Sequence, residues 1–234
     1  MSRRVIQAWL VVLLLLPVLL SLVGASASPV AISSESLAAY AQSDFEIELP
    51  STGTYELIAT RDSFTDKKHK DTNYGTLSQF AVVKRKKRVT LDGNDLEVEQ
   101  ARALIGFDAS PICDGGGVVS ATLQIFGPAS NETNGTRIRE IEDSWNEYGV
   151  TYNNVPGDNQ IDPNISQTTS GGIDTVTFDV RDSVVDDFGN FDAAANAVIH
   201  GWVIRDAKKS VWYSRSASDV HLRPKLTIEI DSCP

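Results

Sequence analysis

The stretch that decides how this chain folds is Asp143-Ser-Trp-Asn-Glu-Tyr-Gly-Val-Thr-Tyr-Asn-Asn-Val-Pro156. It combines a tryptophan, an acid two residues later, a short Val-Thr-Tyr segment at 150–152 and an Asn-Asn-x-Pro turn. β-Branched and aromatic residues favour strands, whereas Asn and Pro favour turns. The stretch therefore predicts a strand over 150–152 followed by a tight turn. It is typical of a structural element in a β-rich domain more than of a catalytic motif.

Short segments on both sides of this stretch show the same strand chemistry. Turn residues separate them, and apolar residues alternate along several of them, as in strands with one buried face. Val119, Ala121, Leu123 and Ile125, for example, are expected to share one inward face. The strands are expected over residues 55–60, 77–83, 102–108, 118–126, 136–142, 175–179, 198–204, 211–213 and 225–230.

One segment has helical spacing instead. Three apolar residues follow Val180 at distances of four, five and eight residues: Val184, Val185 and Phe188. Acids lie on the opposite face, and Gly189 is a natural helix end. We therefore expect a helix over 180–188. Many short strands with one short helix predict an all-β fold, a jelly-roll-type antiparallel β-sandwich.

The first 27 residues have the features of a signal peptide. Arg3 and Arg4 form a positive n-region, residues 11–20 are apolar apart from Pro17, and Ala25-Ser26-Ala27 is a small-residue cleavage site. The alternative is an uncleaved membrane anchor, which the interrupting proline disfavours. We expect a secreted, extracellular chain with no membrane span after cleavage.

The rest of the chain divides into a leader and a domain. Residues 28–54 are rich in Ser, Ala, Glu and Thr, which predicts a flexible leader with one short strand near 45–49. Residues 55–232 are expected to form the β-sandwich domain. That length is enough for a single hydrophobic core.

The charge balance limits the partners. The chain has 21 Lys and Arg against 31 Asp and Glu, a net charge of −10 at pH 7. Removal of the signal peptide takes away two arginines and no acid, so the charge becomes −12. An acidic surface repels phosphate backbones, so nucleic acid is not an expected partner.

The chain has two cysteines, Cys113 and Cys233. An even number of cysteines in an exported protein favours a disulfide, and this one would tie the last strand to the middle of the domain. The alternative is two free thiols.

Several blocks, taken in order, resemble a known family, the DNRLRE domain, which is related to disaggregatase-type carbohydrate-binding modules. No single block is diagnostic, but their order is. The blocks are Ala59-Thr-Arg-Asp-Ser-Phe64, Asp71-Thr-Asn-Tyr-Gly75, Arg102-Ala-Leu-Ile-Gly-Phe-Asp108, Ser120-Ala-Thr-Leu-Gln-Ile-Phe126, the Trp145 stretch, Phe178-Asp-Val180 and Arg223-Pro-Lys-Leu226.

The resemblance implies a non-catalytic β-sandwich that binds extracellular polysaccharide, which in some members is an acidic one such as alginate. Three departures affect what can be transferred. Tyr152 stands where members often have Trp, and Ser216 stands where they often have an acid. Residues 84–101 look like an insertion into a connection that is usually short.

Two kinds of residue are candidates for ligand binding. Sugars stack their C–H faces on aromatic rings and hydrogen-bond through their hydroxyls, so we considered Trp145 with Glu147, and also Tyr74, Tyr148, Trp212 and Tyr213. For Trp145 and Glu147 a structural role in the core is the favoured alternative. The basic runs Lys67-Lys-His-Lys70 and Lys84-Arg-Lys-Lys-Arg88 could hold an anionic glycan, with Lys84, Arg85 and Lys86 as the contacts, or form a solvated hairpin.

A metal ion and a catalytic acid pair were also weighed. Asp62, Asp66, Asp71 and Asn73 offer oxygen ligands within a short loop, which makes a structural Ca²⁺ the one cofactor to consider, although Asp and Asn are also common turn residues. Glu140, Glu142, Asp143 and Glu147 could supply a carboxylate pair for glycoside hydrolysis. No established catalytic motif accompanies them, so an enzyme is not expected.

The sequence leaves three functional hypotheses. The first is an exported, non-enzymatic domain that binds extracellular polysaccharide. The second is a structural or adhesive surface module whose partner is a protein or the cell envelope. The third is a small polysaccharide-degrading enzyme.

Overall fold

The computed structural model describes residues 53–133, 135–161 and 164–234. The predicted signal peptide, the strand near 45–49 and almost all of the predicted leader lie outside these residues. The first strand begins at Gly53, two residues before the predicted start of the domain. In the described residues no helix has the length and apolar composition that crossing a membrane requires.

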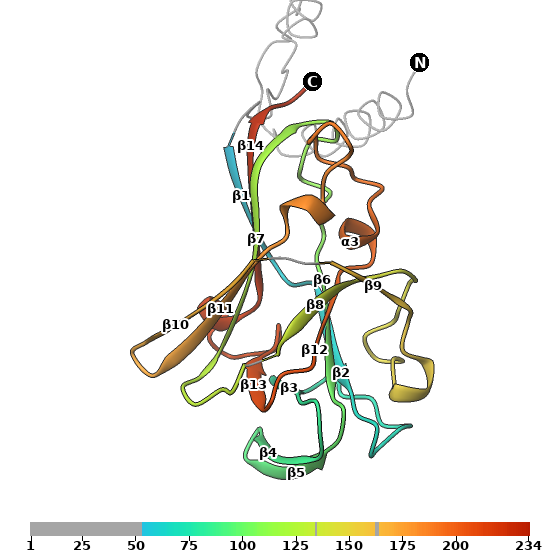
Figure 1. Ribbon diagram of the computed structural model, residues 1–234, viewed down its shortest axis with the longest axis vertical. Coiled ribbons are helices and arrows are strands. Elements are labelled where there is room, and N and C mark those ends of the chain that lie inside the picture. Colours follow the sequence, from blue (N-terminus) through green and yellow to red (C-terminus); the bar gives the residue numbers. More distant parts are fainter. Residues whose placement is uncertain (1–52, 134, 162–163) are drawn as a thin grey trace, which may run out of the picture. The chain divides into compact units, whose positions relative to one another are not determined.

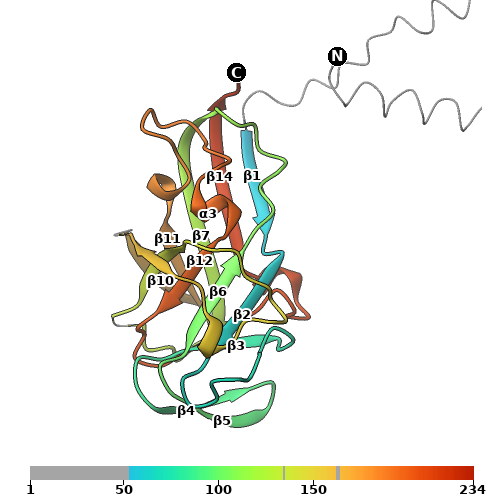
Figure 2. The same cartoon turned by 90° about the vertical axis from the view of Figure 1, so that its right-hand side faces the viewer.

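Two five-stranded antiparallel sheets form the body of the domain (Figures 1 and 2). Sheet A has the strand order β1-β14-β7-β11-β10 and sheet B the order β2-β6-β12-β8-β9. The strands of sheet A are β1 (Gly53–Ile58), β7 (Gly117–Pro128), β10 (Ile165–Ser170), β11 (Ile173–Asp179) and β14 (Lys225–Ser232). Those of sheet B are β2 (Arg61–Thr65), β6 (Arg102–Gly106), β8 (Arg137–Ile141), β9 (Asp158–Gln160) and β12 (Trp202–Arg205). The predicted all-β antiparallel sandwich is confirmed.

Period-two alternation buries one side of each sheet. On β7 the side chains of Ala121, Leu123 and Ile125 are fully buried, whereas those between them are half-buried. Phe64, Phe178 and Trp202 from neighbouring strands fill the same core. Burial of such side chains contributes about 1.5–3 kcal/mol each and is the main force that holds the sheets together.

Val119 departs from the predicted pattern because β7 contains a bulge. Ser120 pairs with Glu229 and Val118 with Ile230, so Val119 is an extra residue that faces no partner. The bulge reverses the alternation, and Val118 is buried while Val119 is 50% exposed. The prediction that Val119 faces inward with Ala121 is therefore wrong.

Two small pairs complete the strands. β3 (Gln79–Val82) pairs with β13 (Ser210–Tyr213), and the insertion forms a hairpin of β4 (Lys87–Leu91) and β5 (Asn94–Val98) at the lower end of Figures 1 and 2. Asp92 and Gly93 make its two-residue turn, both with positive φ. This is the turn type that suits the twist of a hairpin, and Asp-Gly is its common sequence.

Three predicted elements differ from the structure. Residues 180–188 form only a 3₁₀ turn, η2 (Arg181–Ser183), followed by a loop in which Phe188 is 89% exposed. The one α-helix of the described residues is α3 (Asn196–Ile199), which lies partly inside the strand predicted over 198–204. Residues 150–152 are not a strand, and a 3₁₀ turn, η1 (Tyr152–Asn154), follows Thr151. A third 3₁₀ turn is η3 (Val220–Leu222).

The disulfide between Cys113 and Cys233 is present, with 6.0 Å between the two Cα atoms. Cys113 lies in the loop that leads into β7, and Cys233 follows β14. Because Ser232 pairs with Gly117, the bridge joins the ends of two strands that are already neighbours.

Candidate functional site

The tryptophan of the deciding stretch holds a loop against sheet B. Trp145 is 9% exposed and packs with Leu104, Ile141 and Val203, which form a second apolar cluster on this sheet. Its indole nitrogen donates to the carbonyl of His200 at 2.7 Å, and the Arg61 guanidinium lies 5.0 Å from the ring centroid. The polar nitrogen and the apolar surface of the indole are thus both in contact with other residues of the domain. Trp145 has a structural role and is not the sugar platform that was considered.

Glu147 continues this attachment with buried polar contacts. Its Oε1 accepts from the backbone N–H of Asp62 at 3.1 Å and from Nε of Arg215 at 2.5 Å, and its Oε2 accepts from Nη2 of Arg215 at 2.6 Å. The Asn73 amide donates to the carbonyls of Glu147 and Val150. Both oxygens of the Glu147 carboxylate are thus engaged within the protein, in the bidentate geometry that gives strong charge-assisted hydrogen bonds.

Asp62 is the titrating member of this network. Burial raises the pKa of Asp62 to about 7, although its Oδ2 accepts the backbone N–H of Arg215 at 2.5 Å. The folded protein therefore binds this proton more tightly than the unfolded chain does, where the pKa is near 4. Between about pH 4 and pH 7 the native state carries more protons, so stability falls as pH rises through that window and is then constant.

We predict that Asp62→Asn removes this pH dependence. Urea titrations at several pH values give the free energy of unfolding of both proteins. The difference between wild type and variant should fall from pH 4 to pH 7, with a slope that corresponds to at most one bound proton. Parallel curves for the two proteins would show that Asp62 titrates normally in the folded state.

The other aromatic candidates differ in exposure. Tyr74 is buried and stacked on Phe64 with 4.0 Å between the ring centroids, and Trp212 is 1% exposed in the core. These two rings are core residues, so the platform prediction is wrong for them. Tyr213 is half-buried. Tyr148 is 62% exposed, and its hydroxyl accepts from Nη2 of Arg215 at 2.6 Å. Among these candidates Tyr148 offers the most open ring.

The oxygens considered for calcium are used within the protein. Asp66 accepts the N–H groups of Lys68 and Glu99, Asp71 accepts from Asn153, and Asn73 bridges the loop as described above. Among the described residues no group of three or more His, Cys, Asp or Glu side chains converges on a point that could hold a metal. The structure gives the calcium prediction no support.

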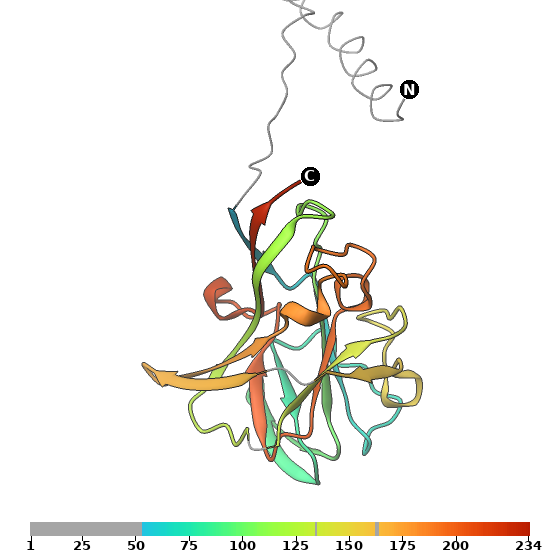
Figure 3. The same ribbon diagram turned by 45° about the horizontal axis from the view of Figure 1, so that its top comes forward.

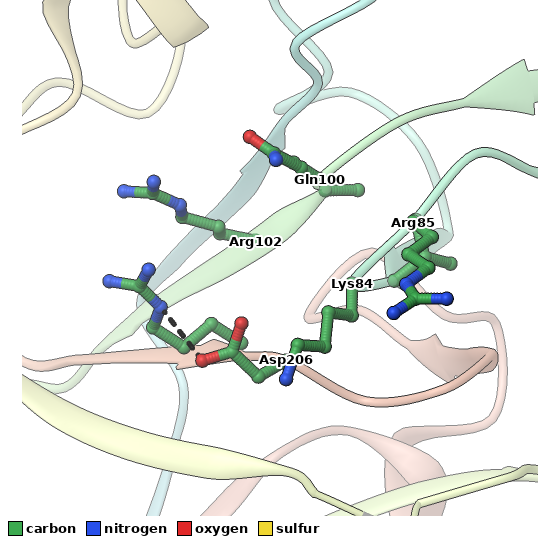
Figure 4. Close-up of a pocket in the computed structure, with 8 residues that line it drawn as sticks. Lys84, Arg85, Gln100, Arg102 and Asp206 are labelled. Atoms are coloured by element: carbon green, nitrogen blue, oxygen red, sulfur yellow. Dashed lines mark ion pairs between the residues drawn. The ribbon is translucent and has the colours of Figure 1, made fainter.

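A basic groove lies where three segments meet, the β3–β4 turn, the start of β6 and the end of β12 (Figure 4). Its first part has a volume of about 280 Å³ and is lined by Val83, Lys84, Arg85, Gln100, Ala101, Arg102, Arg205 and Asp206. A second part of about 360 Å³ shares Lys84, Arg85 and Asp206 and adds Lys87, Gly135 and Lys208. Asp206 is the one acid among these lining residues, which include six cations.

An arginine cluster on sheet B supports one wall of the groove. In register, Arg102 of β6 is level with Arg205 of β12, and Arg205 pairs with Arg137 of β8. Asp158 of β9 lies among them, 2.8 Å from Arg139, 3.3 Å from Arg205 and 3.9 Å from Arg102. Asp206 also pairs with Arg205, at 3.3 Å. Two carboxylates among four arginines leave a net positive charge, so this surface is basic in an acidic protein.

Tyr152 and two strained residues mark the same groove. The Arg102 guanidinium lies 5.9 Å from the Tyr152 ring centroid, and the tyrosine hydroxyl donates to the Gln100 side chain at 3.4 Å. Gln100 and Asp206, both in the lining, have φ values of 48° and 67°. Left-handed backbone at residues other than glycine costs energy and clusters at functional sites.

The sequence identified part of this groove. Lys84 and Arg85 lie in its wall as the basic run suggested, whereas Lys86 points into an ion pair with Glu97 at 2.9 Å and is not in the lining. Sequence reasoning missed Arg102, Arg205, Lys208 and the contact with Tyr152. The sequence did show Arg137 and Arg139 at outward positions of a predicted strand, which could have indicated a basic surface. It did not show which distant strands pair with that strand and bring Arg102 and Arg205 beside it.

Comparison with known families gives one result. The model of carbohydrate-binding module family 96 matches residues 53–230, which is the extent of the β-sandwich. No curated protein matches the chain.

Proposed function

Because the chain belongs to carbohydrate-binding module family 96, we propose that its basic groove binds an anionic polysaccharide without cleaving it. The observation that carries this proposal is the concentration of cations around two adjoining hollows that share Lys84, Arg85 and Asp206, in a chain of net charge −10. These cations attract carboxylate or sulfate groups along a polymer, whereas a neutral glycan carries no charge with which they could pair.

The chemistry of the groove suits such a ligand. Lys84 and Arg85 are exposed and can form charge-assisted hydrogen bonds with acidic groups. Tyr152, held by Arg102, offers apolar contact to a sugar ring at the same place. Exposed cations are screened by salt, so binding of this kind weakens as ionic strength rises.

We further propose that the domain works outside the cell. The predicted signal peptide, the disulfide and the family all agree with this location. Disulfides persist in oxidising compartments.

We predict that Lys84→Ala/Arg85→Ala weakens binding to alginate and to polygalacturonate by about tenfold or more, because each lost charge-assisted hydrogen bond contributes about 1.5–3 kcal/mol. Affinity electrophoresis of the described domain in gels containing either polymer measures this.

The matched control is Lys86→Ala/Arg88→Ala, which removes the same charge from the same run away from the groove lining. Equal weakening in both double variants would indicate a general charge effect and not a groove. No retardation of the wild-type domain by either polymer, or by a sulfated galactan, would contradict the proposed function.

A further inference from the structure

Two apolar side chains that the sequence pattern places inside the protein are exposed, and a hydrogen bond from Val118 N–H to the Gly189 carbonyl joins the segments that carry them. The bulge of β7 turns Val119 outward, and the loop after η2 presents Phe188 to solvent. Bulges often re-aim a side chain beside a functional site, and local patterns tend to fail where function requires it. Neither exposure is explained by the basic groove, which lies on other segments.

A shallow cavity of about 280 Å³ lies at Val119, on sheet A. It is lined by Val119, Ser120, Thr122, Asn164, Ile165, Ser166, Thr177, Asp179 and Arg181, from β7, β10, β11 and the residues that flank them. Its polar groups are mainly hydroxyls, and its two charges, Asp179 and Arg181, are of opposite sign. This lining is the reverse of the basic groove, since it is uncharged overall and mixes hydroxyls with aliphatic carbon.

Arg181 connects this cavity to the Phe188 turn. Its Nε donates to the carbonyl of Val118 at 3.0 Å, beside the bulge. Its Nη2 lies 3.0 Å from the position that a Cβ on Gly189 would occupy. The backbone N–H of Val118 also donates to the carbonyl of Gly189 at 3.1 Å. The turn that carries Phe188 therefore lies beside the cavity wall.

Hydrogen bonds from Asp186 hold the turn that carries Phe188. The carboxylate Oδ1 of Asp186 accepts the N–H groups of Phe188 and Asn190, both at 2.9 Å, and Gly189 has a φ of 84°. These backbone hydrogen bonds hold the pKa of Asp186 below its ordinary value, so the carboxylate is ionised at neutral pH. A preorganised aromatic ring loses little entropy when a ligand packs on it.

We propose that sheet A carries a second saccharide-binding site, formed by the Val119 cavity and Phe188, for a neutral sugar. A sugar ring presents C–H faces that pack on Phe188 and Val119, and hydroxyls that pair with Ser120, Thr122 and Thr177. The balanced charge of the cavity favours an uncharged ligand. The proposal rests on membership of a carbohydrate-binding family, but not on which ligand the basic groove holds.

In Figures 1 to 3 the two sites belong to different parts of the domain. The β10–β11 hairpin extends from the body on the side away from β8 and β9, whereas the β4–β5 hairpin beside the basic groove lies at the lower end in Figures 1 and 2. Separate sites allow one domain to contact two chains, or two distant parts of one chain. Such bivalent contact raises the overall affinity without any stronger single contact.

Affinity electrophoresis in hydroxyethyl cellulose, galactomannan, xyloglucan and laminarin tests the proposal, with protein produced without N-glycosylation because Asn164 begins a sequon. We expect retardation by at least one of these neutral polymers. Phe188→Ala should weaken it about three- to tenfold, while retention by alginate stays unchanged. Val220→Ala, at another exposed apolar residue, is the matched control and should have no effect.

Three results would argue against the proposal. Absence of retardation by all four neutral polymers overturns it, and so does equal retention of the Phe188→Ala variant. If sedimentation shows that the wild type self-associates and Phe188→Ala does not, the exposed ring serves a contact between copies and the sugar site is wrong. Loss of alginate retention alone would contradict the proposed function and leave this site standing.

Discussion

Glu147→Gln is expected to destabilise the domain by about 3 kcal/mol or more, the usual cost of breaking a buried ion pair from one side. Glu147 is buried, and its two oxygens accept three N–H groups from Asp62 and Arg215. Glutamine fills the same space but has one oxygen, so its amide NH₂ meets a donor and one hydrogen bond is lost. The Arg215 charge then lacks its partner, with only partial exposure to water.

The variant should also loosen the loop that the carboxylate attaches. Urea unfolding at pH 7 measures the stability, and hydrogen exchange of residues 143–156 reports local opening. Glu142→Gln is the matched control because it makes the same chemical change at an exposed residue of the same segment. If both variants unfold at the same urea concentration as the wild type, the Glu147–Arg215 pair contributes nothing measurable, and Trp145 and the Asn73 hydrogen bonds hold the deciding stretch.

The effect on binding separates structure from function. Because Tyr152 follows Glu147 in the same loop and contacts Arg102, a loosened loop should reduce alginate affinity indirectly. We expect Glu147→Gln to lose affinity less than Lys84→Ala/Arg85→Ala although it loses far more stability. Complete loss of polysaccharide binding in a Glu147→Gln protein that is still folded would instead make this carboxylate part of the binding site.

Local patterns predicted the strands where burial is one-sided. Alternation along β7, β11 and β14 is visible in the sequence because each has one face in the core and one nearer to water. The disulfide also followed from the cysteine count and the export signal. These features depend on neighbours in the chain or on the compartment, both of which a sequence displays.

Other features depend on pairings between distant strands. The bulge at Val119 arises because β14 skips one residue of β7, which no property of Val119 itself indicates. The helix predicted over 180–188 fails because Val184 is fully buried and Asp186 binds the turn around Phe188, so tertiary contacts override the helical spacing. The β4–β5 hairpin was one of the two alternatives for the basic run at 84–88, and the Asp92-Gly93 turn was a readable signal in its favour.

The sequence predicted only the part of the basic groove that consists of residues adjacent in the chain. A run of cations such as Lys84 and Arg85 is visible directly, but Arg102 and Arg205 come from strands about a hundred residues apart that β-sheet register places side by side. Aromatic residues were a poorer guide, since Trp145, Trp212 and Tyr74 are core residues. Their large apolar area favours burial. The His200 carbonyl accepts from the indole nitrogen of Trp145, whereas Trp212 and Tyr74 are buried although their polar atoms find no hydrogen-bond partner among the described residues.

Removal of the disulfide by Cys113→Ser/Cys233→Ser is expected to cost about 4–5 kcal/mol by the chain-entropy model, because the bridge closes a loop of 120 residues in the unfolded chain. In the folded state little should change, since Ser232 and Gly117 already pair beside the bridge. The loss therefore arises mainly in the unfolded ensemble, which becomes larger and more exposed to solvent. The urea dependence of the free energy of unfolding should accordingly steepen.

Equilibrium urea unfolding of the double-serine variant and of the reduced wild type should give the same midpoint, below that of the oxidised protein. The comparison separates loss of the bridge from loss of the two sulfur side chains, which are partly buried against the core. Alginate affinity at low temperature should stay within about twofold of the oxidised protein, because the basic groove lies on other segments. An unchanged midpoint would show that the bridge does not constrain the unfolded chain, and a lower midpoint with an unchanged slope would place its contribution in the native packing instead.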